Sequence, residues 1–185
     1  MYSRNSEPVR FERDCPVVLV PSGEAVTMPA GSIGYITQSL GGSFTVFVEG
    51  NLMRIAGVDA DAIGKEPPTP IELPEGAGDE DVEKLVWQQL RTCFDPEIPI
   101  NVVDLGLVYS AEVKPHADKP GQRLVEVRMT LTAPGCGMGD VLVADVRDKV
   151  EMIPTVAEAD VELVFDPPWT RDMMSEAARL QVGMF

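Results

Sequence analysis

One cysteine lies where a thiol could act as a nucleophile or as a ligand for a soft metal. Cys136 stands in the stretch Thr132–Gly139, between the end of a predicted strand and the start of a predicted helix. A helix N-terminus favours the thiolate, which is the form that attacks electrophiles and binds soft metals. Gly135 and Gly137 leave little side-chain bulk around the sulfur. We therefore interpret Cys136 as a functional thiol; the alternative is a turn in which cysteine is merely a small residue.

A second unusual stretch runs from Asp95 to Gly106. It opens with Asp95-Pro96-Glu97 and is too rich in proline and acid for the interior of a helix or a strand. Apolar residues recur within it, so we expect an ordered loop packed on the domain. Its acids Asp95, Glu97 and Asp104 are candidate ligands for a hard or borderline metal, or caps for backbone groups. Capping is the simpler interpretation for Asp104.

A third stretch, Asp166-Pro167-Pro168-Trp169, follows a predicted strand. Consecutive prolines fix φ and remove backbone donors, so the strand must end there. The segment then forms either a rigid wall beside a site, or a simple strand terminator that buries the indole of Trp169. The residues themselves leave both interpretations open.

The other cysteines and the single histidine do not extend the candidate site. Cys93 falls on the apolar face of a predicted helix and is expected in the core, and Cys15 receives no role. His116 lies in a polar hairpin turn, away from the expected position of Cys136, which argues against a Cys/His dyad. There is no CxxC pair, so an intrachain zinc site would need four unrelated segments to converge.

Composition narrows the classes of function. The 185 residues carry a net charge of -15, which argues against nucleic acid and anionic membranes as partners. Three cysteines form a poor disulfide framework and indicate a reducing compartment. No signal peptide, membrane-spanning run or nucleotide-binding motif is visible, so we expect a soluble, cytoplasmic protein.

The chain divides into three parts. Residues 1–64 predict a small β-rich domain, and residues 65–78 a proline- and glycine-rich linker. For residues 79–185 we expect a larger domain, because stretches with apolar residues at helical spacing follow stretches in which apolar and polar residues alternate. The strands expected in the first part are Val17–Val20, Ile33–Thr37, Phe44–Val48 and Leu52–Ile55.

The last part predicts three helices and three strands. The helices are expected over 80–94, 139–153 and 171–181, and the strands over 107–113, 124–132 and 160–165. Alternation places Tyr109 on the apolar face of the first strand, and it places Met129 inward and Thr130 outward in the second. The fold class is therefore α+β: a small three-stranded α/β sandwich in the order helix–strand–strand–helix–strand–helix, preceded by a small all-β, barrel-like region.

Three motifs of this last part together resemble the metal–sulfur cluster assembly domain family. They are Asp95–Pro99, Val103–Tyr109 and Thr130–Cys136, in this order and at this spacing. The resemblance covers a little over half of the chain. The tail from Asp166 through Leu180, and the extra N-terminal β region, resemble the SufT branch of that family.

The resemblance implies an accessory factor that helps deliver iron–sulfur clusters to client proteins rather than an enzyme. The family's key cysteine falls on Cys136, and its acidic motif falls on Asp95, Glu97 and Asp104. The implied partners are iron–sulfur scaffold or carrier proteins and apo-protein clients, and homodimers occur in the family. The implied cargo is a labile cluster; a cluster usually takes four ligands, so Cys136 would share it with a partner or a second subunit.

Two other classes of function remain open on the sequence. The chain could be a metal-free adaptor between a scaffold and its clients, because it lacks a full ligand set of its own. It could instead be a thiol enzyme with Cys136 as the nucleophile, although the sequence places no base beside that thiol.

Overall fold

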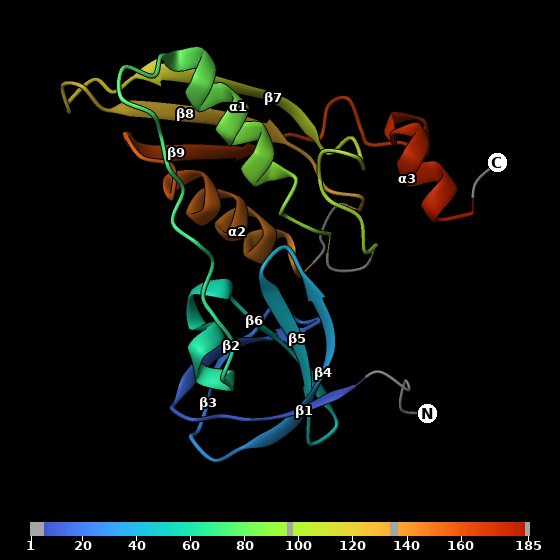
Figure 1. The fold of residues 1–185 in the computed structure, drawn as a ribbon. Coiled ribbons are helices and arrows are strands. Elements are labelled where there is room, and N and C mark those ends of the chain that lie inside the picture. The colour runs from blue at the N-terminus through green and yellow to red at the C-terminus, as the bar shows by residue number, and fades with distance from the viewer. Residues whose placement is uncertain (1–5, 96–97, 134–136, 184–185) are drawn as a thin grey trace. The chain divides into compact units, whose positions relative to one another are not determined.

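The computed structural model describes residues 6–95, 98–133 and 137–183, and the chain forms two compact units, Met1–Thr69 and Pro70–Phe185 (Figure 1). The candidate residues Pro96, Glu97, Gly135 and Cys136 lie outside the described residues. Sheets combine with few helices, which confirms the mixed α+β class. In the part of the chain that the model describes, no helix is long and apolar enough to cross a membrane.

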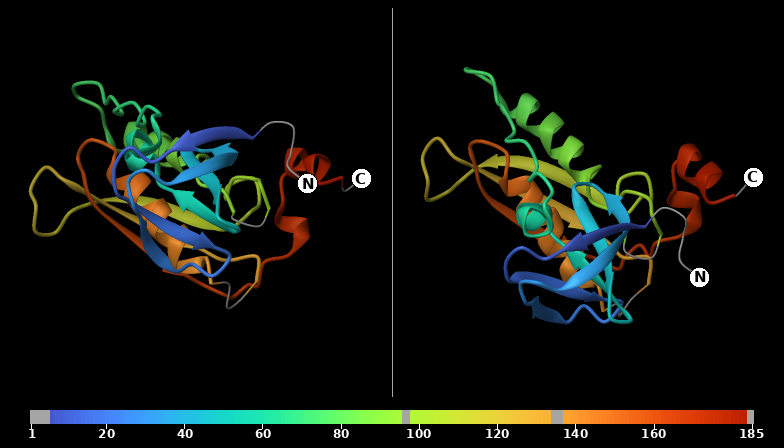
Figure 2. Two further views of the ribbon diagram at one scale, coloured as in Figure 1. Left: turned by 90° about the horizontal axis from the view of Figure 1, so that it is seen from below. Right: turned by 60° about the horizontal axis from the view of Figure 1, so that its bottom comes forward.

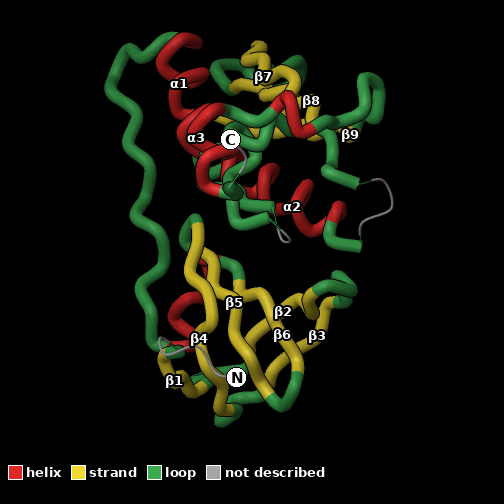
Figure 3. The backbone as a smooth tube through the Cα atoms, turned by 90° about the vertical axis from the view of Figure 1, so that its right-hand side faces the viewer, coloured by secondary structure: helices red, strands yellow, loops and turns green. Residues whose placement is uncertain are grey.

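The first unit is built on one six-stranded sheet in which every neighbouring pair is antiparallel (Figure 3). Its order is β1-β4-β5-β6-β2-β3. The strands are β1 (Glu7–Arg10), β2 (Cys15–Val20), β3 (Ala25–Met28), β4 (Ile33–Leu40), β5 (Ser43–Val48) and β6 (Asn51–Ile55). Among the described residues β1 and β3 are the edges of this order, and the barrel-like form is not confirmed.

Two strands of this sheet were not predicted from the sequence. β1 and β3 have four residues each, which is too short for an alternating pattern to stand out. After β6, a 3-10 helix over Gly57–Ile63 brings Ala62 and Ile63 into the core of the first unit. The core also contains Phe11, Val46 and Ile55, all nearly inaccessible.

The second unit stacks two helices on one face of a three-stranded sheet. The sheet has the order β7-β8-β9 and comprises β7 (Val108–Pro115), β8 (Arg123–Met129) and β9 (Val156–Leu163). β7 and β8 form an antiparallel hairpin, and β9 returns parallel to β8. The helices α1 (Asp79–Leu90) and α2 (Gly139–Glu151) share one core with the sheet. Ile71 and Leu73, in the proline-rich segment, also pack against this core.

The C-terminal tail does not form the single helix that was predicted. A 3-10 turn over Arg171–Met173 is followed by Met174 in an extended conformation, and α3 spans only Glu176–Gln181. Ser175 ends the interruption, because its hydroxyl oxygen accepts a hydrogen bond from the amide of Ala178 at 3.1 Å and caps α3. Figures 1 and 2 show α3 at the end of the sheet opposite the β7–β8 hairpin turn.

The other boundaries differ from the predictions in smaller ways. α1 stops at Leu90 instead of Phe94, because the next residues form a tight turn in which the amide of Cys93 bonds to the carbonyl of Leu90. β9 begins at Val156, several residues earlier than expected. The register of β7 shifts between Val108 and Ser110, so Tyr109 leaves the expected inward alternation.

A buried thiol in the first unit lies beside an ion-pair network. Cys15 is inaccessible to solvent, and burial raises the pKa of its thiol to about 11, helped by the nearby carboxylate of Asp59. Arg13 bonds to Asp59 at 3.0 Å and to Asp61 at 2.7 Å. These hydrogen bonds raise the pKa of the Arg13 guanidinium and lower the pKa of the Asp61 carboxyl.

We predict that Cys15 resists alkylation in the native protein. At mildly alkaline pH the folded thiol stays protonated and covered, whereas the unfolded thiol has an ordinary pKa near 9 and reacts. Iodoacetamide labelling followed by peptide mass spectrometry, with and without concentrated guanidinium chloride, measures the difference. Because only the unfolded state ionises between about pH 9 and 11, this thiol should also lower the free energy of unfolding as pH rises through that range. Equal labelling rates in the two states would contradict the assignment.

Candidate functional site

Three of the stretches singled out in the sequence adjoin the same end of the three-stranded sheet. The register places Val108 at the start of β7 beside Met129 at the end of β8, and Met129 beside Leu163 at the end of β9. The loop 98–107 enters β7 at this end, residue 130 onwards leaves β8 there, and the chain toward Trp169 leaves β9 there. Sheet topology therefore gathers segments that lie far apart in the sequence.

The acidic loop is held by its own side chains. Asp95 is buried, and its carboxylate accepts a hydrogen bond from the amide of Ile98 at 2.9 Å. Asn101 forms the next turn, since its side-chain oxygen accepts from the amides of Val103 and Asp104 at 3.1 and 3.0 Å. A buried carboxylate with a backbone partner acts as a structural cap, so the geometry around Asp95 is that of a loop anchor.

Asp104 differs from its expected capping role. Its carboxylate accepts a hydrogen bond of 2.6 Å from the side-chain amide of Asn101. The backbone capping in this turn is done by Asn101, which was not among the candidates from the sequence. An Asn three residues before an Asp, in a stretch rich in turn formers, was the available signal.

The Pro167–Trp169 segment and the residues after it are fastened to the acidic loop. The indole N–H of Trp169 donates to the carbonyl of Leu105 at 2.7 Å, and the hydroxyl of Tyr109 donates to the carbonyl of Pro167 at 2.6 Å. The amide of Ser175 donates to the carbonyl of Asp104 at 2.8 Å. Pro167 and Pro168 are exposed, and the Trp169 ring packs partly buried against the core. The tail is thus more than a strand terminator, because it is bonded to the loop that enters β7.

Gly106 is the point of closest approach between the loop and the tail. Its φ is +76°, in the left-handed region that favours glycine, and a Cβ built on it would lie 2.2 Å from the carbonyl oxygen of Met173. No side chain fits at that distance. The motif glycine is therefore required both by its backbone conformation and by the tail against it.

The segment that carries Cys136 is closed at its base. Leu131 and Met138 are buried on either side of it, and a Cβ built on Gly139 would lie 2.8 Å from Cδ1 of Leu131. Ala133 and Gly137 are the described residues that come nearest before and after Cys136 in the sequence, and both are exposed. Cys136 itself stands three positions before the first residue of α2, in the chain order expected for a thiol near a helix N-terminus.

Thr130 is a buried residue that the sequence placed on the solvent side. It is 1% exposed, and its hydroxyl has no hydrogen-bond partner in the described part of the chain. Its amide bonds to the carbonyl of Leu107, and the carbonyl of the preceding Met129 accepts from the amide of Val164. The end of β8 therefore lies between the backbone at Leu107 and the backbone at Val164. The alternation of residues within one strand could not show that these neighbours cover Thr130.

The remaining candidate ligands do not converge. Cys93 is buried in the core, as predicted. His116 lies in the hairpin region and faces Glu158 on β9, with Nε2 and Oε2 3.0 Å apart. Within residues 6–95, 98–133 and 137–183, no group of three or more His, Cys, Asp or Glu side chains could hold a metal ion.

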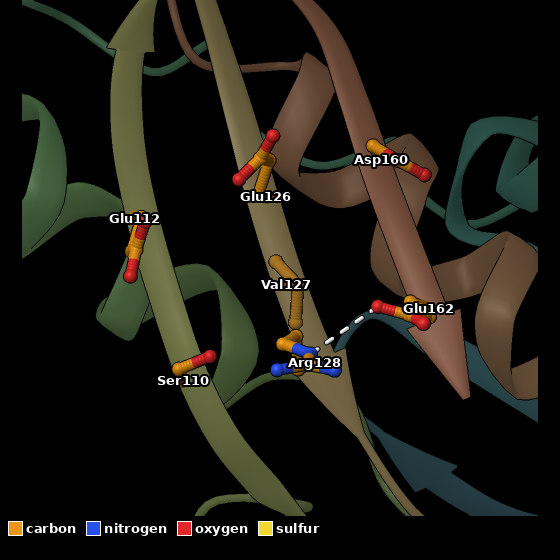
Figure 4. Close-up of a pocket in the computed structure, with 7 residues that line it drawn as sticks. All are labelled: Ser110, Glu112, Glu126, Val127, Arg128, Asp160 and Glu162. Atoms are coloured by element: carbon orange, nitrogen blue, oxygen red, sulfur yellow. Dashed lines mark hydrogen bonds and ion pairs between the residues drawn. The ribbon is translucent and has the colours of Figure 1, made fainter. Parts of the chain in front are cut away.

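The face of the sheet opposite the helices is charged and contains a hollow of about 310 Å³ (Figure 4). Arg128 pairs with Glu162 across it at 3.2 Å, and Lys114 bonds to Glu126 beside it. The hydrogen bonds of Lys114 with Glu126 and Glu112 raise the pKa of the Lys114 ammonium group. The hollow is lined by Ser110, Glu112, Glu126, Val127, Arg128, Asp160 and Glu162. This face therefore offers charged contacts on the side of the sheet away from the helices.

Comparison with known proteins gives a consistent result for the second unit. The family model described as iron-sulfur cluster assembly protein matches residues 83–162. An Fe-S protein maturation auxiliary factor of Porphyromonas gingivalis is 46% identical over 101 residues, which cover 55% of this chain and 90% of that protein. The Fe-S protein maturation auxiliary factor SufT of Staphylococcus aureus is 41% identical over 91 residues, covering 49% and 97%.

A solved structure also matches. The crystal structure of a domain of unknown function (DUF59) from Bacillus anthracis has 32% sequence identity and a TM-score of 0.48, and the match covers 58% of this chain and 96% of that one. Each of these proteins is matched over nearly its whole length by about half of the present chain.

We predict that Gly106→Ala destabilises the second unit far more than Gly121→Ala. Both glycines have a φ of +76°, but a Cβ on Gly121 would meet nothing within 4 Å. The control should therefore cost only left-handed strain, about 1–2 kcal/mol, whereas the contact with Met173 should add roughly 1–3 kcal/mol. Both tryptophans lie in the second unit, so urea unfolding followed by tryptophan fluorescence reports on that unit. Equal losses in the two variants would show that the tail does not press on Gly106.

Proposed function

The chain belongs to the iron–sulfur cluster assembly protein family and is an accessory factor of cluster assembly, and we propose that it helps deliver clusters to client proteins through the thiol of Cys136. The observation that carries the proposal is the match over residues 83–162, which includes Cys136 and the acidic loop. The relatives are named as maturation auxiliary factors, which supports a role other than turnover of a small substrate.

The surroundings of Cys136 support a thiol that is presented to a partner. The segment between Leu131 and Gly139 is clamped at its base, and its described flanks at Ala133 and Gly137 are exposed. In the sequence, Gly135 and Gly137 are small neighbours of Cys136, which leave room for a partner's surface. Cys15 and Cys93 are both inaccessible to solvent, which leaves Cys136 as the candidate thiol for this task.

In this proposal the cluster is cargo rather than a resident cofactor. An iron–sulfur cluster usually takes four protein ligands, and the described residues offer no set of His, Cys, Asp or Glu that could hold even a single metal ion. Cys136 would therefore supply one ligand, and a scaffold, a client or a second subunit would supply the others. If the ligands are shared in this way, transfer of the cluster requires direct contact between this protein and its partner. Three cysteines without a CxxC pair also agree with a reducing, cytoplasmic compartment.

A metal-free adaptor is the second candidate, and the same lack of a ligand set among the described residues favours it. In this case the loops and the tail would present a surface to a scaffold and a client, and Cys136 would not touch the cluster. Anaerobic reconstitution with iron and sulfide, followed by native mass measurement, separates the two. An absorption band that requires Cys136 supports shared ligation, whereas a colourless protein that still binds clients supports the adaptor.

We predict that Cys136→Ser lowers the activity of iron–sulfur client enzymes in cells toward the level of a strain that lacks the protein. The serine keeps the size of the side chain but loses the thiolate, so the free energy of unfolding should change by no more than about 0.5 kcal/mol. Cys15→Ala is the matched control, because it removes a buried thiol from the other unit and should leave client activity unchanged. Normal client activity in the Cys136→Ser strain would rule out the thiol role.

A further inference from the structure

The sheet of the first unit carries an apolar stripe on its outward face. Strand register aligns one residue from each of five neighbouring strands. Pro8 pairs with Tyr35, Tyr35 with Phe47, Phe47 with Leu52, and Leu52 with Val20. The stripe therefore crosses β1, β4, β5, β6 and β2, which are neighbours in this order in the sheet drawn in Figure 3.

The alternation of each strand shows that the stripe faces away from the core. Gly34, Ile36, Val46, Val48 and Met53 flank these positions along the chain and are all buried. In contrast, Tyr35 is 41% and Leu52 39% exposed, and Ile33, one row away on β4, is 65% exposed. Large apolar side chains in an unbroken row on the outside of a sheet are unusual in a surface that meets only water.

Two arginines lie beside the stripe in an otherwise acidic protein. On the outward face of these strands, Arg10 stands opposite Ile33 on one side of the stripe, and Arg54 stands between Thr45 and Val18 on the other side. Two acidic residues border the stripe: Glu7, next to Pro8, forms an ion pair with Lys65, and Glu49 stands in the exposed turn after β5, two positions beyond Phe47. With Glu7 paired to Lys65, the two arginines and Glu49 give the border of the stripe a small positive charge, in contrast to the net charge of -15 of the whole chain.

We propose that this stripe is a docking surface for a protein segment that carries both apolar and acidic side chains. Its apolar residues would cover the row from Pro8 to Val20, and its carboxylates would pair with Arg10 and Arg54. Four strand spacings make the stripe roughly 19 Å long, which corresponds to about six residues of extended chain or about thirteen of helix. This inference goes beyond cluster delivery and does not depend on Cys136.

The same features argue against other occupants. A second copy of the chain would bring two arginines against two arginines, and like charges across an interface oppose association. Single-stranded nucleic acid stacks on aromatic side chains, but it needs a positively charged groove along its backbone, and two arginines in a chain of charge -15 do not provide one. A segment of another protein with apolar and acidic side chains could cover the apolar row and also pair with the arginines beside it.

The test begins with a photo-crosslinker in the full-length chain. p-Benzoylphenylalanine is placed at Leu52 and, as the control, at Val58, which is 65% exposed and lies in the 3-10 helix after the sheet. After irradiation of cells, mass spectrometry identifies the peptide joined to each position. We expect the Leu52 position to join a segment of another protein that contains apolar and acidic residues, and the Val58 position not to do so.

The affinity of that segment completes the test. A fluorescein-labelled synthetic peptide with the cross-linked sequence is titrated with the full-length protein. Leu52→Ser and Arg54→Glu should each weaken binding by about tenfold or more, high salt should weaken it too, and Val58→Ser and Cys136→Ser should not. Retained circular dichroism spectra show that the variants are folded.

Several outcomes would overturn the proposal. They are cross-links from Leu52 to a second copy or to this chain itself, cross-links no different from those at Val58, and peptide binding that ignores Arg54→Glu. Tight binding of labelled oligothymidylate that is lost in Leu52→Ser would assign the stripe to nucleic acid instead. Since Cys136→Ser is expected to bind the peptide normally, failure of this inference and failure of the thiol role are distinguishable.

Discussion

The close approach of two backbone segments at Gly106 organises the end of the second unit where the motifs meet. Because a carbonyl of the tail lies where a side chain would otherwise be, the loop and the tail can exchange hydrogen bonds through Asp104 and Leu105. The same contact explains why the tail is not one continuous helix. In a continuous helix the amide of Ser175 would bond to Arg171, whereas in this fold it bonds to Asp104.

The core of the second unit lies on one face of its sheet and supports the loops at the end of that sheet. Both long helices cover the same face of the sheet, so the loops at the sheet's end are supported from one side by packed side chains. Asp95, which could have been a metal ligand, is used to hold its loop, and Asn101 holds the next turn. Asp95 and Asn101 therefore hold the described part of this loop, and the proposed function leaves the chemistry to Cys136.

The two units divide the chemistry of the chain. The second unit corresponds to proteins that are complete at about half of this chain's length, so the first unit is an addition to the assembly domain. Its core contains an inert thiol, and its outward face carries an apolar stripe with basic flanks. In the proposals made above, the first unit would select a partner through this face, and the second unit would carry the cluster through Cys136.

The sequence by itself determined the α+β class, the burial of Cys93 and the family motifs, because local periodicity and short motifs carry that information. It missed the two four-residue strands and the break at Met174, since short elements are decided by what they pack against. Only the tertiary structure showed that Thr130 is covered, that Trp169 bonds to Leu105 and that five apolar residues from five strands form one stripe. These features depend on strand register and on contacts between distant segments, which no local pattern of residues specifies.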